Sequence, residues 1–124
     1  MATAKTLFSD QKRHDSFWIM EGKESISFIL SSCFDYNLGE WDCGSVQISK
    51  KDFIQGIKEF LETGVCQVNN FEMRRNQEGI YIFVGKSFDV FTSHWTTIEW
   101  TISSDIKIKN FLKMLRKKVR KMEN

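Results

Sequence analysis

The chain has 124 residues and a formal net charge of +2, and 41% of its residues are hydrophobic, 14% aromatic and 27% charged. This balance is typical of a globular protein and excludes an intrinsically disordered chain. The length suits one domain over 1–124, and the absence of proline excludes proline-rich linkers and polyproline ligands.

The first strands are predicted to follow a mobile lead-in over 1–15. The segments 17–20, 25–31 and 45–49 are apolar or alternate apolar with polar residues, which is the pattern of strands. Within 25–31 every second side chain is a large apolar one, so three residues are predicted to face the core: Ile26, Phe28 and Leu30.

A helix is predicted directly after the third strand. Ser49 can cap its N-terminus and Asp52 lies three residues on, which is the spacing of a capping box. Gly64 stands where such a helix stops. Five apolar residues fall on one stripe at helical spacing and predict the buried face: Phe53, Ile54, Ile57, Phe60 and Leu61.

The second half of the chain repeats this order. Strands are predicted over four segments: 67–75, 79–86, 88–91 and 97–103. In the last of them, Ile98, Trp100 and Ile102 alternate with polar residues and are predicted to face the core. A second helix begins after Ser104, and six apolar residues form its buried arc: Ile108, Phe111, Leu112, Leu115, Val119 and Met122.

These patterns divide the domain into two units, 16–64 and 65–124, each with strands first and a helix last. Runs of strands followed by a helix argue for antiparallel pairing. The sequence therefore predicts an α+β fold: an antiparallel sheet with two amphipathic helices in a strands-helix-strands-helix pseudo-repeat.

Positive charge is concentrated at the C-terminal end. Residues 104–124 hold eight Lys or Arg and two acidic residues, a net charge of +6, whereas the rest of the chain carries −4. A solvated helix face explains these cations. The alternative is a phosphate-binding patch, because clustered cations release counterions when they meet a polyanion. Five cations lie opposite the apolar arc: Lys109, Lys113, Arg116, Lys117 and Arg120.

Aromatic residues on strands give a second signal. Tyr81 and Phe83 alternate with core-facing aliphatic residues, so both rings are predicted on the opposite side of the sheet, where Trp18 can join them. Rings on a sheet with cations at its ends are a common means of binding single-stranded nucleic acid. The alternative is that a loop, an arm or a second chain covers this face. Three cations flank the hairpin: Arg74, Arg75 and Lys86.

The residues that could carry catalysis form no recognised motif. Three cysteines and two histidines lack the spacing of zinc ligands, and the glycines form neither a P-loop nor a dinucleotide fingerprint. We therefore expect no enzyme, no metal and no cofactor. The odd number of cysteines, with no signal peptide and no membrane-length segment, predicts a reduced cytoplasmic protein without membrane contact.

The order of strands and a capped helix, twice over, resembles the PUR and Whirly group of single-stranded nucleic-acid-binding domains. The segments 17–31 and 46–49 carry the resemblance in the first unit, and 71–82 and 97–103 carry it in the second. In such repeats a hairpin presents stacking and basic residues while the helix packs behind the sheet. The first unit departs from this pattern because its loop is acidic. The resemblance implies contacts by Trp18, Lys23, Arg74, Arg75, Tyr81 and Phe83.

The chain also resembles small bacterial toxin-immunity proteins of the WapI type. These close with a segment like 98–102 followed by 111–115. The resemblance implies a protein that plugs a toxin, with the basic helix or the acidic loop at Asp35, Glu40 and Asp42 supplying charge complementarity.

The sequence thus predicts a non-enzymatic module that binds single-stranded DNA or RNA through an aromatic sheet face and the basic C-terminal helix. The alternative is a protein-binding module, most concretely an immunity or inhibitor protein with a toxin as partner, and a homodimer is compatible with either. The predicted nucleic-acid contacts are Trp18, Lys23, Arg74, Arg75, Tyr81, Phe83, Lys86, Lys109, Lys113, Arg116, Lys117 and Arg120.

Overall fold

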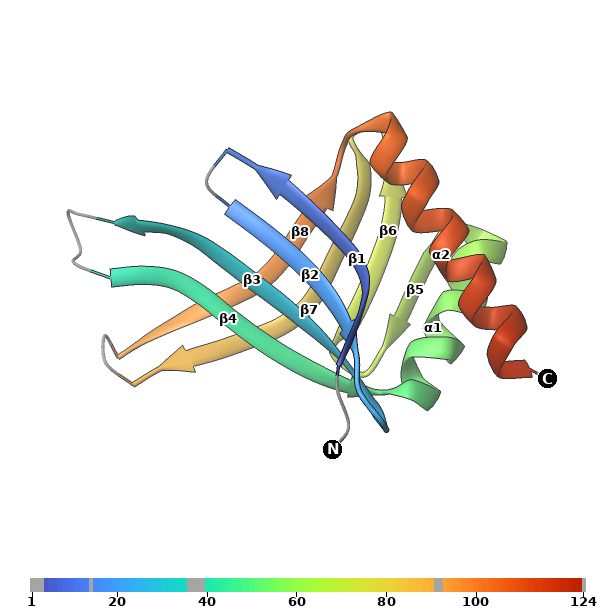
Figure 1. Ribbon diagram of the computed structural model, residues 1–124, viewed down its shortest axis with the longest axis horizontal. Coiled ribbons are helices and arrows are strands. Elements are labelled where there is room, and N and C mark those ends of the chain that lie inside the picture. Colours follow the sequence, from blue (N-terminus) through green and yellow to red (C-terminus); the bar gives the residue numbers. More distant parts are fainter. Residues whose placement is uncertain (1–3, 14, 36–39, 91–92, 124) are drawn as a thin grey trace.

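The computed structural model describes residues 4–13, 15–35, 40–90 and 93–123. The element order within these ranges confirms the predicted α+β class and its strands-helix-strands-helix plan (Figure 1). No helix within these ranges is both long and apolar enough to cross a membrane. The elements are β1 (Lys5–Lys12), β2 (Asp15–Glu21), β3 (Ser25–Asp35), β4 (Glu40–Ser49), α1 (Lys50–Thr63), β5 (Val65–Val68), β6 (Phe71–Asn76), β7 (Gly79–Asp89), β8 (His94–Ile102) and α2 (Asp105–Glu123).

The strands form two antiparallel sheets, where the sequence predicted one. Sheet A has the order β1-β2-β3-β4 and sheet B the order β5-β6-β7-β8. The second unit thus builds sheet B alone, whereas β1, which precedes the first unit, completes sheet A. Each sheet has one apolar face, and burying both requires that the two faces meet. Figure 1 shows the sheets crossing one another, with α1 and α2 packed together at one end.

The N-terminal segment is a strand and not the mobile lead-in that the sequence predicted. β1 pairs with β2 at both ends, and a register shift between Thr6 and Phe8 leaves Leu7 without a partner and breaks the alternation. Its buried residues are Phe8 and the polar Asp10. Because the bulge disturbs the period of two and one of the inward side chains is a carboxylate, the sequence shows no apolar alternation here.

The core lies between the sheets and is rich in aromatic rings. Phe17 of sheet A stacks on Trp100 of sheet B with 5.5 Å between ring centroids, and the Phe28 and Phe71 centroids lie 5.3 Å apart. Alternation predicted the inward faces correctly, although Leu30, Val46 and Ile48 are half-buried at the border of the core. The buried residues of β3, β7 and β8 are Ile26, Phe28, Ile80, Ile82, Val84, Ile98, Trp100 and Ile102.

The ends of α1 and the β6–β7 turn lie at residues whose chemistry favours a cap or a turn. Ser49 Oγ accepts a hydrogen bond from Asp52 N at 3.1 Å at the start of α1, and Gly64 ends that helix with a φ of 82°. The β6–β7 turn requires glycine, because Gly79 has a φ of 136° and a Cβ there would lie 1.9 Å from the Ile102 carbonyl oxygen.

Glu21, at the end of β2, ties both helices to sheet A. Its carboxylate oxygens lie 2.5 Å from Lys118 Nζ of α2 and 3.4 Å from Lys50 Nζ of α1. Burial alone would raise the pKa of Glu21, but the two ammonium groups outweigh it and hold that pKa below its ordinary value of 4.5. The Glu21 side chain is 16% exposed and that of Lys118 10%, so this joint is largely shielded from water.

Candidate nucleic-acid interface

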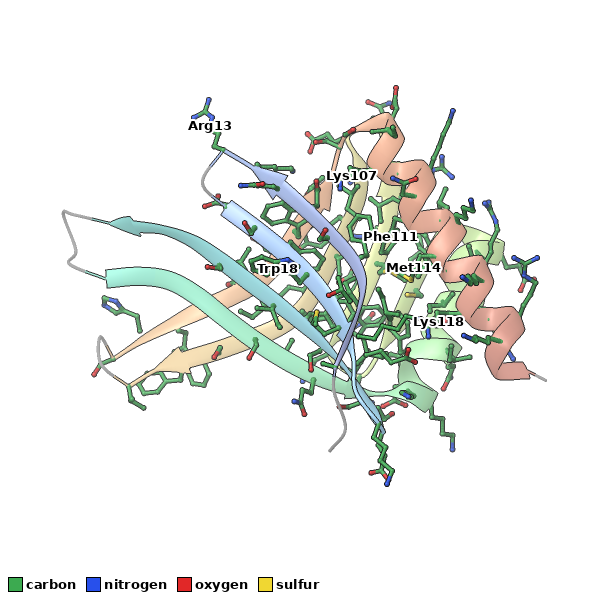
Figure 2. All side chains as sticks on the ribbon, viewed as in Figure 1. Arg13, Trp18, Lys107, Phe111, Met114 and Lys118 are labelled. Atoms are coloured by element: carbon green, nitrogen blue, oxygen red, sulfur yellow. The ribbon has the colours of Figure 1, made fainter. Side chains whose placement is uncertain are left out.

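Trp18 lies on the outer face of sheet A, the face turned away from the core. Its neighbours Phe17 and Ile19 are buried on the inner face, so Trp18 points outward, where it is half-buried. In the register Trp18, which is labelled in Figure 2, stands between Ser9 of β1 and Ile29 of β3. A partly exposed ring on a sheet offers a platform on which a base can stack.

The outer face of sheet A carries no acidic side chain among the described residues. Asp10, Asp15 and Glu21 belong to sheet A but lie on its core side by alternation, where Asp10 accepts a hydrogen bond from Trp100 and Glu21 pairs with Lys118. A neutral face does not repel a polyanion, so the described part of this surface is compatible with one. By alternation and register the face consists of Thr6, Ser9, Gln11, Ser16, Trp18, Met20, Ser25, Ser27, Ile29, Ser31, Ser45, Gln47 and Ser49.

A groove of about 320 Å³ between β1 and α2, here called the lysine groove, adjoins this face. No acidic residue lines it, and Lys118 is the one lining lysine paired with a carboxylate among the described side chains. Such a cluster of cations attracts phosphate. The lining lysines are Lys5, Lys113, Lys117, Lys118 and Lys121.

Thr6 joins the lysine groove to the outer face of sheet A. It lines the groove, and its Oγ1 lies 3.2 Å from Met20 Sδ on the outer face. Trp18 is two residues further along β2, about 7 Å at the rise of a strand. Lys107 Nζ donates to the Ser9 carbonyl oxygen at 2.9 Å and holds α2 against this edge of the sheet. Figure 2 shows the row of labelled α2 side chains that includes Lys107 and Lys118.

The five cations predicted on α2 are all exposed, and their helical spacing places them on one face of the helix. Lys113 and Lys117 line the lysine groove, whereas Lys109, Arg116 and Arg120 do not line it. Lys23, predicted as a contact in the first unit, is exposed in the β2–β3 turn.

Tyr81 and Phe83 lie on the outer face of sheet B, as alternation predicted, but apart from Trp18. The sheets pack through their inner faces, so their outer faces point in opposite directions. Tyr81 OH donates to Glu99 at 2.6 Å, and Phe83 stands between Glu72 and Glu99 in the register. Burial raises the pKa of Tyr81 to about 12, and the hydrogen bond to Glu99 acts in the same direction. The two carboxylates make this face a poor path for phosphates.

The three cations predicted to flank the Tyr81 hairpin do not lie together. Arg74 lies 5.1 Å from the Tyr81 ring centroid, but its Nε is paired with Glu72 at 3.0 Å. Arg75 follows Arg74 along β6 and so points to the opposite side of the strand, near the C-terminal end of α1. Lys86 is exposed and lines a hollow next to β4. The structure therefore does not bring Arg74, Arg75 and Lys86 onto one surface.

Sequence reasoning missed Lys5, Lys121 and Met20 as parts of the interface. Lys5 lies in the segment predicted to be mobile, and only the packing of α2 against β1 brings it beside the lysines of the helix. Met20 was predicted to lie in a strand, but the sequence did not indicate which face of the sheet its side chain occupies. Of the acidic loop that the alternative function uses, residues 36–39 lie outside the described residues, and so do the side chains of Asp35, Glu40 and Asp42 at the ends of β3 and β4.

The described residues contain no group of three His, Cys, Asp or Glu that could hold a metal ion. Cys66 is buried against α1, and burial raises the pKa of its thiol to about 11, which makes it a poor nucleophile.

The outer face of sheet A and the lysine groove together form the candidate interface. No family model, no curated protein and no solved structure matches the chain.

Proposed function

We propose that this protein binds single-stranded DNA or RNA across the outer face of sheet A, as a binding module without catalysis. Trp18 stacks on a base, and the lysine groove holds phosphates of the backbone. The observation that carries the proposal is the continuity of the two parts. An outer face that carries Trp18, and no acidic side chain among its described residues, meets a groove lined by Lys5, Lys113, Lys117 and Lys121.

A single strand fits this surface better than a duplex. Stacking on Trp18 needs a base whose face is free, and duplex bases are already stacked on their neighbours. The hydroxyl and amide side chains around Trp18 can donate to and accept from base edges without favouring one base strongly. Sheet B supports the proposal less well, because Glu72 and Glu99 flank its rings.

Replacing Trp18 with alanine is expected to weaken single-strand binding by about 1–3 kcal/mol, the cost of one lost base stack. Fluorescence anisotropy of a labelled oligothymidylate, titrated with protein at constant salt, measures this loss. Trp95→Ala is the matched control, because Trp95 is 67% exposed and pairs with Phe88 on sheet B. Unchanged affinity in a folded Trp18→Ala protein, or an equal loss in both variants, would remove sheet A as the binding face.

The lysine groove is tested by the salt dependence of binding. Lys113→Gln with Lys117→Gln is expected to reduce the slope of log affinity against log salt by about 1.4, since each phosphate contact on a single strand contributes about 0.7. The control pair, Lys109→Gln with Arg120→Gln, removes two exposed cations of the same helix that do not line the groove. A slope that changes equally in the two pairs would mean that α2 acts through its overall charge and not through the groove.

A protein-binding function is the second candidate, and a separate observation favours it. The tip of the β7–β8 hairpin exposes Phe88, Val90 and Trp95, and the Phe88 and Trp95 rings lie 5.1 Å apart. Exposed apolar clusters of this kind commonly mark protein contacts. If oligonucleotides do not bind at low salt, an inhibitor or immunity role becomes the better proposal, with Trp95→Ala as the variant expected to lose the partner.

A further inference from the structure

A second hollow, of about 430 Å³, lies at the edge of sheet A opposite the lysine groove and is here called the β4 hollow. It opens where β7 extends beyond β6: the last β6–β7 pair is Glu72 with Phe83, and a bulge at Gly85 follows. β4 and the β5–β6 turn border the opening. Its volume falls within the range of small-ligand sites, about 300–1,000 Å³.

The β4 hollow is lined by groups that suit a base better than a phosphate. Gln47 and Asn70 are exposed, and their side chains form no hydrogen bond with another described residue. Asn69 Nδ2 donates to Asp52 Oδ2 at 2.9 Å, so a carboxylate also borders the hollow. That charge disfavours a phosphate. An amide presents one donor and one acceptor side by side, which matches the N6 and N7 edge of adenine.

One row of side chains crosses sheet A between the two hollows. The register pairs Thr6 with Met20, Met20 with Ser27, and Ser27 with Gln47. Thr6 lines the lysine groove and Gln47 lines the β4 hollow, so the row begins in one site and ends in the other. Four strands span about 14 Å, which is about four nucleotides at the stacked spacing of 3.4 Å.

We propose that the bound strand crosses sheet A along this row, with its phosphates in the lysine groove at one end and a base, preferably adenine, in the β4 hollow at the other. This inference rests on the proposed function and adds a direction, a length and a base-reading subsite to it.

A length series of oligothymidylates, from dinucleotide to dodecanucleotide, tests the path. The path holds about six nucleotides: four across the sheet, one in the lysine groove and one in the β4 hollow. Affinity is therefore expected to rise steeply with length up to about six nucleotides and to change little beyond that length. An adenine placed at one end of the hexanucleotide should strengthen binding about tenfold relative to an adenine at the other end, because only one end reaches the amides. Anisotropy at constant salt measures each affinity.

The double variant Gln47→Ala with Asn70→Ala is expected to remove the adenine preference and to leave dinucleotide binding unchanged. Gln67→Ala, an exposed strand glutamine on sheet B, is the matched control and should keep the preference. Affinity that does not depend on length, or a preference that survives in the double variant, would overturn the path while the proposed function stands. Absence of binding at every length would overturn both.

Discussion

Replacing Trp100 with alanine is expected to lower the free energy of unfolding by about 3–5 kcal/mol, the range for truncating a buried aromatic side chain. Trp100 is 7% exposed, its ring stacks on Phe17, and its Nε1 donates to Asp10 Oδ2 at 2.8 Å. Truncation leaves a cavity between the two sheets and a buried carboxylate without this donor. Urea denaturation followed by circular dichroism measures the change.

Two variants separate the contributions of Trp100. Trp95→Ala removes the same side chain from an exposed site of the same strand and is expected to change stability by less than about 0.5 kcal/mol. Trp100→Phe keeps most of the ring packing but deletes the N–H donor to Asp10, so an intermediate loss of about 1–3 kcal/mol is expected. A loss in Trp100→Ala no larger than in Trp95→Ala would contradict the position of β8 in the core.

Replacing Glu21 with glutamine is expected to destabilise the fold by about 3 kcal/mol, the lower end of the range for breaking a buried ion pair. The reason is that Lys118 keeps its charge in a shielded site but loses its carboxylate. Thermal and urea denaturation at neutral pH measure the loss. Glu24→Gln, in the exposed β2–β3 turn, is the control and should be nearly neutral.

The same residue gives a pH dependence with a definite sign. The pKa of Glu21 is lower in the folded protein than its ordinary value of 4.5, so its stabilising contribution is complete above that value and is lost as pH falls through the folded pKa. The difference in stability between the parent protein and Glu21→Gln should therefore shrink on acidification below about pH 4.5. A difference that stays constant to lower pH would mean that the ion pair contributes no charge-dependent stability.

Sequence patterns predicted most of the local structure because each strand buries alternate side chains. The period of two in 25–31 and 97–103 identified both the strands and their inward faces, and Ser49 and Gly64 marked the ends of α1. β1 was missed because its bulge and the buried Asp10 hide the pattern. The division into two sheets was missed because alternation defines which side of a strand is apolar, not which strands share a sheet.

The site was only partly predicted because a local pattern shows which way a side chain points but not which elements pack together. Sequence reasoning found Trp18, Lys113 and Lys117, because an outward ring and an outward cation are visible in the period of one element. It placed Trp18 and Tyr81 on one surface, whereas their sheets face opposite ways. It also overlooked Lys5, because the lysine groove depends on a contact between β1 and α2 that no local pattern encodes.

The contacts that join β1 and β2 to β8 and α2 also bear on the order of folding. Lys107 and Ser9 are 98 residues apart, Lys118 and Glu21 are 97 apart, and Trp100 and Asp10 are 90 apart. Such non-local contacts carry a high loop-closure entropy and tend to form late, after the local hairpins of each meander. The lysine groove therefore comes into existence only when these last contacts close. A partly folded chain with both sheets formed would still lack its site for phosphate. Only the completely folded protein therefore has the binding surface.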